Sequence, residues 1–278
     1  MVGRIHIMGI VNLTPDSFYA GSRAGADHAL DRIRMQFSEG ADVVDLGACS
    51  TRPGAPQPSL EEEWSRLEPV LHRLSSGVEE VFPGAKKKAD APGNTSSIPM
   101  LSIDTYRAGI VSRAYDLIGP FMVNDVGGGE WDPEMLSTVG RLGLPYVAMC
   151  PSCATVEEII AWFRAFSFKA AEAGLRDWIL DPGFGFGKDL DQNYAVLRGL
   201  DRIVSAFPQE VLAGVSRKSM IYKKLGITPE EAMPATQVVQ FAALEKGATW
   251  LRVHDVAAAV HTARLYSTIY TSSPGAAK

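Results

Sequence analysis

Polar and charged side chains stand at the ends of most short apolar runs in this chain. Asp104, Asn124 and Asp181 each close such a run, and we expect them to lie deep inside the protein. Two carboxylates and one amide that face inward suit a heterocycle whose edge is rich in N–H and amidine groups. These residues therefore predict a buried pocket that binds a guanine-like or pterin-like ring.

A second set of side chains is cationic. Arg52, Arg217, Arg252 and His254 follow three different apolar runs, and they would converge on one rim if the ends of those runs meet. Guanidinium and imidazole groups on one rim favour an anion such as phosphate or diphosphate. Asn12 offers a neutral oxygen that can help to hold Mg²⁺ already bound to phosphate oxygens. No Ser/His/Asp or Cys/His nucleophile arrangement is evident, which favours direct transfer between two bound substrates.

Each of these residues also has a purely structural interpretation. Asp104 and Thr105 can cap the helix that follows them, and Asn124 can satisfy the backbone of a turn. The basic pair at 217–218 can be surface charge, and His254 can be a packed core histidine. The functional interpretation is favoured because almost every apolar run delivers polar groups at the same end.

Eight short apolar runs precede these groups, and we predict that they form β-strands. Runs of about five residues rich in Val, Ile and Leu suit strands that are buried on both faces of a parallel sheet. The predicted strands are Ile5–Val11, Ala41–Leu46, Met100–Asp104, Phe121–Asn124, Pro145–Met149, Trp178–Asp181, Val211–Val215 and Thr249–Val253. Helical patterns separate them, so a doubly wound sheet and a closed (β/α)₈ barrel both fit. The length of 278 residues favours a single-domain α/β barrel of the TIM type, whose chemistry lies at the C-terminal strand ends.

Helix signals between the strands support this alternation. Segments 59–62 and 155–158 are Ser-x-x-Glu and Thr-x-x-Glu capping boxes, and Thr, Pro and Glu within 228–231 predict a third helix start. The segment 85–99 breaks the compact pattern with three lysines followed by Pro, Gly, Asn, Thr and Ser. We predict a mobile insertion there and a frayed tail after residue 271.

Composition limits the partners and the location of the protein. A net charge of −5 argues against nucleic acid or an anionic membrane bound over a broad surface, but not against a small anion in a local basic pocket. No apolar run reaches the ~18 residues that a membrane span needs. The apolar segment Ile5–Leu13 lacks the small-residue cleavage site of a signal peptide. We therefore expect a cytoplasmic protein.

The chain has three cysteines, Cys49, Cys150 and Cys153. A small, odd number of cysteines does not make a disulfide framework. The last two form a C-x-x-C pair, which is a redox or zinc pair in one interpretation and two reduced thiols in the other. The second is favoured, because no evident second pair of zinc ligands accompanies the first.

Five segments together resemble the signature blocks of dihydropteroate synthase. They are Asn12–Phe18, Ser50–Gly54, Asp181–Lys188, Ser216–Ser219 and Arg252–Val256. Their order and spacing match the family from Ile7 to about Arg264. The resemblance implies a barrel, a homodimer, and transfer of a dihydropterin-6-ylmethyl group from its diphosphate to p-aminobenzoate with Mg²⁺.

The resemblance also implies three groups of contact residues. The pterin would be held by Asp104, Asn124, Asp181, Lys218 and Arg252. The diphosphate and its metal would be held by Asn12, Thr51, Arg52, Arg252 and His254, with Asn12 as the metal ligand. The p-aminobenzoate pocket, which sulfonamides would share, would be shaped by Thr51, Pro53, Phe186, Lys218 and Ser219. The residues expected to act in catalysis are Thr51, Arg52, Asp104, Lys218 and Arg252.

In the mechanism that the resemblance implies, diphosphate leaves first and the amine captures a cationic pterin methylene, which Asp104 helps to stabilise. The chain departs from the family pattern at Ala20, Cys49 and Cys150, where many members have an acid, Glu and His respectively. None of the three is among the residues expected to contact substrate. A pterin-binding methyltransferase domain and a non-catalytic paralogue are the alternatives. The diphosphate-binding segments argue against the first, and the intact basic residues argue against the second.

Overall fold

The computed structural model describes residues 3–13, 23–49, 57–76 and 100–270 of the chain. The predicted insertion at 85–99 and the predicted tail after residue 271 lie outside these ranges. The strands are β1 (His6–Asn12), β2 (Val43–Gly47), β3 (Met100–Asp104), β4 (Met122–Asp125), β5 (Tyr146–Met149), β6 (Trp178–Asp181), β7 (Leu212–Ala213) and β8 (Trp250–Val253).

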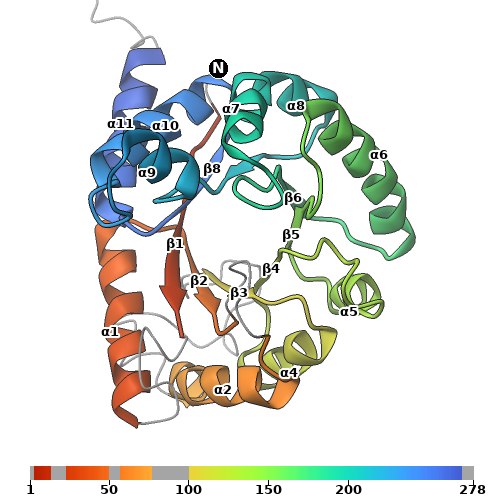
Figure 1. The fold of residues 1–278 in the computed structure, drawn as a ribbon. Coiled ribbons are helices and arrows are strands. Elements are labelled where there is room, and N and C mark those ends of the chain that lie inside the picture. Colours follow the sequence, from red (N-terminus) through yellow and green to blue (C-terminus); the bar gives the residue numbers. More distant parts are fainter. Residues whose placement is uncertain (1–2, 14–22, 50–56, 77–99, 271–278) are drawn as a thin grey trace, which may run out of the picture.

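These strands form one parallel sheet in the order β6-β5-β4-β3-β2-β1-β8-β7. A parallel bridge between Leu180 of β6 and Val211, just before β7, joins the two ends of that order. The backbone N–H of Leu180 also donates to the carbonyl of Glu210 at 2.9 Å. The sheet is therefore closed, and the predicted (β/α)₈ TIM barrel is confirmed (Figure 1).

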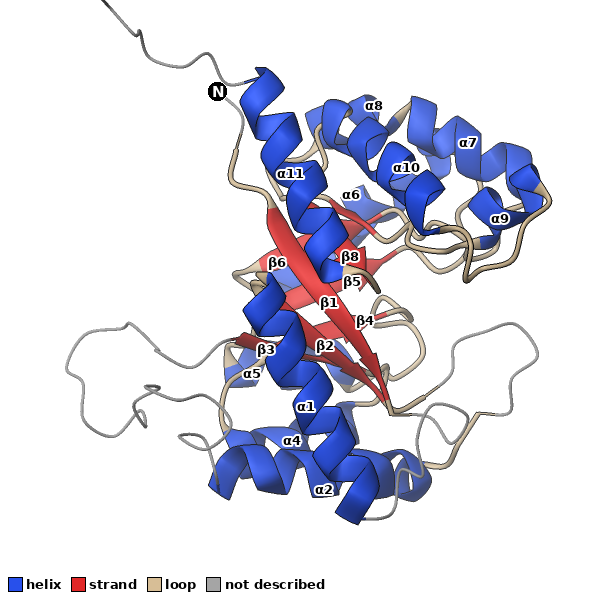
Figure 2. Cartoon of the chain, turned by 90° about the vertical axis from the view of Figure 1, so that its left-hand side faces the viewer, coloured by secondary structure: helices blue, strands red, loops and turns tan. Residues whose placement is uncertain are grey.

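Helices lie between the strands and outside the barrel (Figures 1 and 2). In the described ranges they are α1 (Arg23–Glu39), α2 (Leu60–Ser76), α4 (Ala108–Ile118), α5 (Met135–Leu142), α6 (Val156–Glu172), α7 (Leu190–Arg198), α8 (Leu200–Ala206), α9 (Ser219–Leu225), α10 (Met233–Glu245) and α11 (Val256–Tyr270). None of the helices described is long and apolar enough to cross a membrane.

Two of the three predicted helix starts are confirmed, and the third is displaced. Ser59 and Glu62 exchange capping hydrogen bonds before α2, and Thr155 and Glu158 do the same before α6. The cap bonds between Thr228 and Glu231 also form, at 2.9 and 3.4 Å, but they close only a turn. The helix predicted to begin there begins at Met233, so that prediction was wrong by about one turn.

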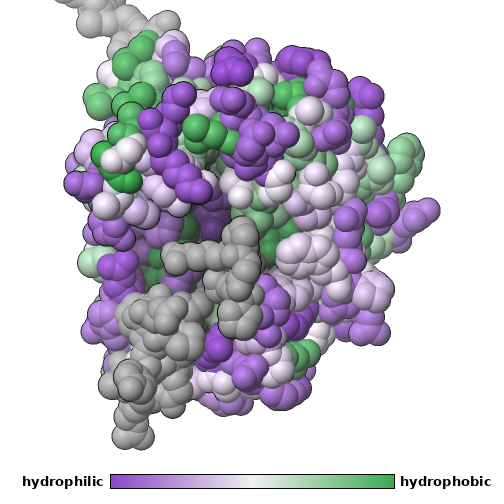
Figure 3. All heavy atoms as spheres, in the orientation of Figure 1, coloured by the Kyte–Doolittle hydropathy of each residue, from purple (hydrophilic) through white to green (hydrophobic). Residues whose placement is uncertain are grey.

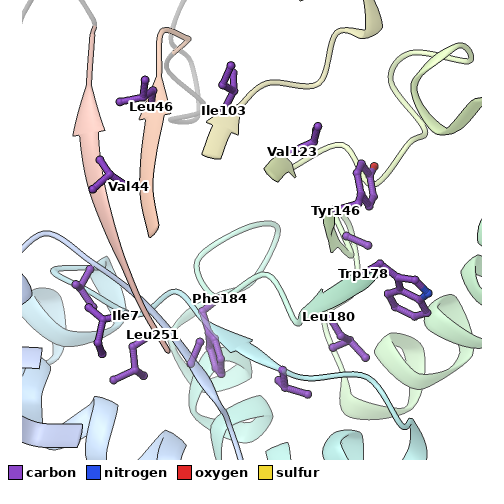
Figure 4. Close-up of a cluster of buried hydrophobic side chains, with 14 of the residues drawn as sticks. Ile7, Val44, Leu46, Ile103, Val123, Tyr146, Trp178, Leu180, Phe184 and Leu251 are labelled. Atoms are coloured by element: carbon purple, nitrogen blue, oxygen red, sulfur yellow. The ribbon is translucent and has the colours of Figure 1, made fainter. Parts of the chain in front are cut away.

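Buried apolar side chains form two clusters because successive strand residues point to opposite faces of a sheet. The larger cluster joins strand residues to helix residues such as Leu30 and Phe163, so it fills the space between barrel and helices. Figure 4 shows four of its strand members, Val44, Leu46, Ile103 and Val123. The smaller cluster contains only strand residues and fills the barrel interior: Met8, Val43, Met122, Val147, Ile179, Leu212 and Trp250.

A polar layer lies directly above this interior cluster, toward the C-terminal strand ends. Asp45, Asn124, Asp181 and Arg252 each come two residues after a member of the cluster, on the same strand. A spacing of two keeps side chains on one face of a strand. Four strands therefore send an apolar side chain and then a polar one into the same barrel, which places the polar layer where barrel enzymes hold their chemistry.

Candidate active site

Hydrogen bonds join three residues of the polar layer, Asp45, Asn124 and Arg252, to Asp104 at the end of β3. The Nε of Arg252 donates to Oδ2 of Asp45 at 2.7 Å, and Nη2 of Arg252 donates to Oδ2 of Asp104 at 2.8 Å. The Nδ2 of Asn124 donates to the same Asp45 oxygen at 2.9 Å. The structure therefore brings together three residues that the sequence predicts to contact a pterin, and adds Asp45 as the partner of both Arg252 and Asn124.

Burial governs the protonation of this group. It raises the pKa of Asp104 to about 7, with Arg252 opposing the rise and the carboxylate of Asp45 adding to it. Burial alone would lower the pKa of Arg252, but Asp45 and Asp104 outweigh it and the pKa is raised. Arg252 therefore stays protonated, while Asp104 can gain or lose a proton near neutral pH.

Asp181 and Lys218 form the opposite side of the pocket. A Cβ on Gly214 would lie 3.8 Å from Nζ of Lys218 and 3.9 Å from Oδ2 of Asp181, so both groups approach this glycine. Burial lowers the pKa of Lys218 to about 8, although Asp181 opposes that fall. Burial also raises the pKa of Asp181, which Lys218 opposes. Each group therefore favours the charged form of the other, against the effect of burial.

The loop after β6 joins this side of the pocket to Phe186. The Nζ of Lys218 donates to the carbonyl of Phe184 and lies 4.7 Å from the centre of the Phe186 ring. Gly183, Gly185 and Gly187 have φ values of +71°, +80° and +61°, which favour glycine over other residues. The glycine run is therefore a defined bend that carries Phe186 over the lysine.

Cys150 and Cys153 are joined by a disulfide at the end of β5. The interpretation as two reduced thiols was therefore wrong for this structure. A separation of three positions allowed the bond, but neither the spacing nor the composition could decide between thiols and a disulfide. The disulfide loop packs on the β6 loop, since a Cβ on Gly183 would lie 2.8 Å from the carbonyl oxygen of Cys150.

Arg217 differs from its predicted role on an anion-binding rim. Its guanidinium donates to both carboxylate oxygens of Asp255, at 2.9 and 2.6 Å. Its backbone is left-handed, with φ +52°, which is uncommon for a residue other than glycine. The pair therefore helps to hold the bend that turns Lys218, the next residue, into the pocket.

His254 lies on the rim as predicted, with Nδ1 at 3.0 Å from the hydroxyl of Ser216. Partial burial, together with the nearby guanidinium groups of Arg252 and Arg217, lowers the pKa of His254 to about 4, although much of the residue is exposed. Without an anion His254 is therefore neutral at pH 7, and a bound diphosphate would favour its protonation.

The other predicted site residues divide into two groups. Asn12 ends β1 near Asp104, since a Cβ on Gly47 would lie 3.5 Å from the amide oxygen of Asn12 and 3.6 Å from Oδ2 of Asp104. Ser219 begins α9 directly after Lys218 and is half-buried. The remaining three predicted site residues, Thr51, Arg52 and Pro53, lie outside the described residues.

The structural alternative for Asp104 is excluded by its contacts. Helix α4 begins at Ala108, whose N–H donates to Asp132 at 2.8 Å, and Thr105 accepts from the N–H of Arg107 at 3.2 Å. Asp104 instead points to Arg252. Asp45 was missed because it stands inside a predicted strand, and only its position two residues after Val43 could have revealed it.

A cavity of about 320 Å³ lies at the other end of the barrel, near the strand starts. Two of the carboxylates that line it are already engaged, since Asp42 pairs with Arg4 and Glu210 accepts from the indole of Trp250. Barrel enzymes carry their chemistry at the opposite end, where the polar layer lies. The candidate site is therefore the C-terminal pocket and not this cavity.

The fold and the polar layer define a class of ligand-binding barrel, and comparisons with known proteins specify it. A family model described as pterin binding enzyme matches residues 8–83 and 89–254. Dihydropteroate synthase of Clostridium beijerinckii is 34% identical over 263 residues, covering 91% of this chain and 90% of that protein. The Bacillus subtilis dihydropteroate synthase is 33% identical over 258 residues, covering 90% and 83%.

Solved structures agree with these relatives. A Clostridium difficile dihydropteroate synthase with pteroic acid superposes with a TM-score of 0.84 at 34% identity, covering 98% of both chains. A Xanthomonas albilineans dihydropteroate synthase with 4-aminobenzoic acid gives 0.82 at 34%, covering 98% of this chain and 95% of that one. This chain belongs to the pterin-binding enzyme family, and within it to the dihydropteroate synthases, which are transferases. The resemblance inferred from the sequence is confirmed.

Proposed function

We propose that the protein condenses 7,8-dihydropterin-6-ylmethyl diphosphate with p-aminobenzoate, giving 7,8-dihydropteroate and diphosphate for folate synthesis. The observation that carries the proposal is that Asp104, Asn124, Asp181, Lys218 and Arg252 converge at the C-terminal end of one barrel. The carboxylates there can accept hydrogen bonds from ring N–H groups. The amide and the cations can bind the remaining polar atoms on the edge of the ring.

Ring binding and bond breaking would take place at different depths of the pocket. The ring would lie between the Asp104 side and the Asp181 side of the pocket, which directs its methylene toward the rim. There the carbon–oxygen bond to diphosphate breaks, and the amine nitrogen of p-aminobenzoate forms the new bond and loses a proton. Arg252 and a protonated His254 would hold the leaving diphosphate, and the carboxylate of Asp104 would stabilise positive charge that develops on the pterin.

We also propose that Mg²⁺ enters with the diphosphate. No cluster of three or more His, Cys, Asp or Glu residues that could hold a metal occurs in the described part of the chain. The donor set at this rim is therefore poor, with the neutral amide oxygen of Asn12 beside Asp104. Such a set fits an ion that keeps phosphate oxygens and waters as ligands. Bound Mg²⁺ would neutralise charge on the leaving group.

Incubation of the purified protein with both substrates and Mg²⁺, followed by chromatography, tests the activity. Formation of dihydropteroate and diphosphate in equal amounts is expected, and its absence would contradict the proposal. Methyl transfer in a separate incubation with a methylated folate would favour the methyltransferase alternative. The same assay tests the non-catalytic alternative, because such a protein would bind the pterin without turnover.

We further propose that sulfonamides compete with p-aminobenzoate beside Phe186. A Yersinia pestis dihydropteroate synthase, 28% identical with a TM-score of 0.80 and covering 97% of this chain and 95% of that one, has been solved with a sulfonamide drug. Phe186→Leu changes the pocket wall without removing a charge. The sulfonamide inhibition constant and the Michaelis constant for p-aminobenzoate should change by different factors, because the drug is larger than the substrate. Equal factors would show that the two ligands share all their contacts.

A homodimer is the last proposal, and it rests on exposed apolar side chains of α10 and α11. Val238 is 71% exposed, and Leu265 and Ile269 are each 62% exposed. Figure 3 shows hydrophobic residues gathered over these helices.

A cytoplasmic location remains a prediction.

A further inference from the structure

Asp45 lies beneath the pocket and touches two of the residues assigned to the pterin. It is fully buried on β2, and its Oδ2 accepts from both Arg252 and Asn124, at 2.7 and 2.9 Å. Its Oδ1 has no hydrogen-bond partner among the described residues. A carboxylate on a fully buried strand is costly unless it is paired and hydrogen-bonded, so these two contacts are needed to keep Asp45 there.

The chemistry of a carboxylate determines how Asn124 must lie. A carboxylate only accepts hydrogen bonds, so the amide has to turn its NH₂ group toward Asp45. The reverse orientation would place the amide oxygen against a carboxylate oxygen with no proton between them. One N–H is used in this contact, which leaves the carbonyl oxygen and the second N–H for a ligand. Asn124 therefore presents an acceptor beside a donor.

Arg252 is restrained by the same carboxylate. Its Nε donates to Asp45 and its Nη2 donates to Asp104, so two of its nitrogens are held by two different carboxylates. A planar guanidinium held through two nitrogens cannot rotate without breaking at least one of these bonds. Asp45 thus constrains residues from two strands, β4 and β8, that lie on different sides of it in the sheet order.

We propose that Asp45 is a positioning residue that sets the hydrogen-bonding pattern of the pterin pocket by fixing Asn124 and Arg252 together. Asp45 touches no substrate and acts through Asn124 and Arg252. The inference rests on the proposed function, because Asp45 would make the same pocket selective for a ring with matching donors and acceptors.

Asp45→Asn tests the proposal because it keeps the volume and removes both the charge and the acceptor-only character. Titration calorimetry with the pterin diphosphate should show affinity weaker by roughly 10- to 100-fold, the effect of losing a hydrogen bond to a charged group. The Michaelis constant for p-aminobenzoate at saturating pterin diphosphate should stay close to that of the wild type. A change confined to the p-aminobenzoate constant, or none at all, would overturn the proposal.

Ser102→Ala is the matched control. Ser102 is fully buried, stands opposite Asp45 in the register of β2 and β3, and its Oγ has no hydrogen-bond partner within the described ranges. This variant alters the same barrel layer without touching Asn124 or Arg252, so its pterin affinity should be unchanged. A loss as large as that of Asp45→Asn would show a general effect of the layer and would overturn the positioning role.

A double-mutant cycle separates positioning from structural support. If Asp45 acts through its partner, the Asp45→Asn effect should shrink when Asn124→Ala is already present. Fully additive effects would contradict the proposal. Should Asp45→Asn fail to fold, amide NMR of the wild type decides, since one Asn124 side-chain proton should exchange slowly with solvent. Rapid exchange of both protons would overturn the proposal. A wild type that neither binds the pterin diphosphate nor forms product would instead refute the proposed function.

Discussion

Asp104 and Asp181 each bring a carboxylate into the pocket that lies above Asp45. Both are at least 92% buried, and each lies near one cation, Arg252 or Lys218. We expect Asp104→Asn and Asp181→Asn to weaken pterin diphosphate binding by about 2–5 kcal/mol, the usual effect of breaking a buried charged pair. Calorimetry measures this directly. Unchanged affinity in both variants would remove these residues from the pterin pocket.

The raised pKa of Asp104 also predicts how stability depends on pH. The pKa is about 7 in the folded protein, against about 3.9 for an ordinary aspartate. Between those values the folded state holds the proton more tightly, so the contribution of Asp104 to the free energy of unfolding falls as pH rises. Asp104→Asn lacks this fall. Its stability relative to the wild type should therefore rise from about pH 4 to about pH 7 and then level off.

Urea unfolding of the two proteins at several pH values measures this difference. Subtracting the wild type cancels the other titrating groups, such as His254, whose lowered pKa has the opposite effect on stability. A difference that stays flat or falls across the window would mean that Asp104 is ionised throughout, with Arg252 outweighing the effect of burial.

At the scale of elements, the strands were predictable because their apolar runs are short and bounded by polar groups. Met100–Asp104 and Trp178–Asp181 were predicted to the residue. Strand β7 was predicted as Val211–Val215 but spans only Leu212–Ala213, since hydropathy does not report where a ladder of hydrogen bonds stops. The start of α10 was missed because local capping can close a turn without continuing as a helix.

The predicted site residues that are described could be placed at one end of the barrel because parallel strands share a direction. Their partners could not be predicted in the same way. Arg217 and Arg252 are both basic residues near strand ends, yet one pairs with Asp255 outside the pocket and the other with Asp45 and Asp104 inside it. Which carboxylate an arginine meets depends on which face of the strand carries it and on backbone bends such as that at Arg217.

The disulfide between Cys150 and Cys153 joins the end of β5 to the start of α6. A loop this short constrains the unfolded chain only modestly, by about 2 kcal/mol in the chain-entropy account. Adding a dithiol reductant should therefore lower the free energy of unfolding by no more than that amount. Chemical denaturation with and without reductant measures the effect.

Cys153→Ser provides the control, because it removes the bond and should abolish the response to reductant. Cys49→Ala should keep the response, since Cys49 is a buried cysteine that takes no part in the disulfide. A response that persists in Cys153→Ser would show that the reductant acts elsewhere in the protein.

At the scale of the whole molecule, the barrel brings together residues that are far apart in the chain. Asp45 and Arg252 are separated by 207 positions, and β1 lies between their strands β2 and β8 in the sheet. The pocket therefore exists only when the first and last strands have paired. Partial unfolding at either terminus should remove pterin binding even if the central strands persist.

The surface of α10 and α11 supports the last prediction, a homodimer. Leu265 and Ile269 stand four residues apart on α11 and so share one helix face, and Val238 adds to it from α10. Apolar side chains that gather on a surface often mark a protein interface. We expect the wild type to have twice the chain mass in light scattering at micromolar concentration.

Replacing both Leu265 and Ile269 with Lys should give a monomer, because a lysine ammonium loses its hydration when an apolar interface closes over it. Phe168→Lys is the matched control, since Phe168 is 76% exposed on α6, away from the proposed interface. That variant should remain dimeric. A wild type with the mass of one chain would refute the dimer, and a dimer that survives the double substitution would place its interface elsewhere. Because the double substitution leaves the barrel pocket untouched, pterin affinity measured in the monomer also tells whether the site is complete within one chain.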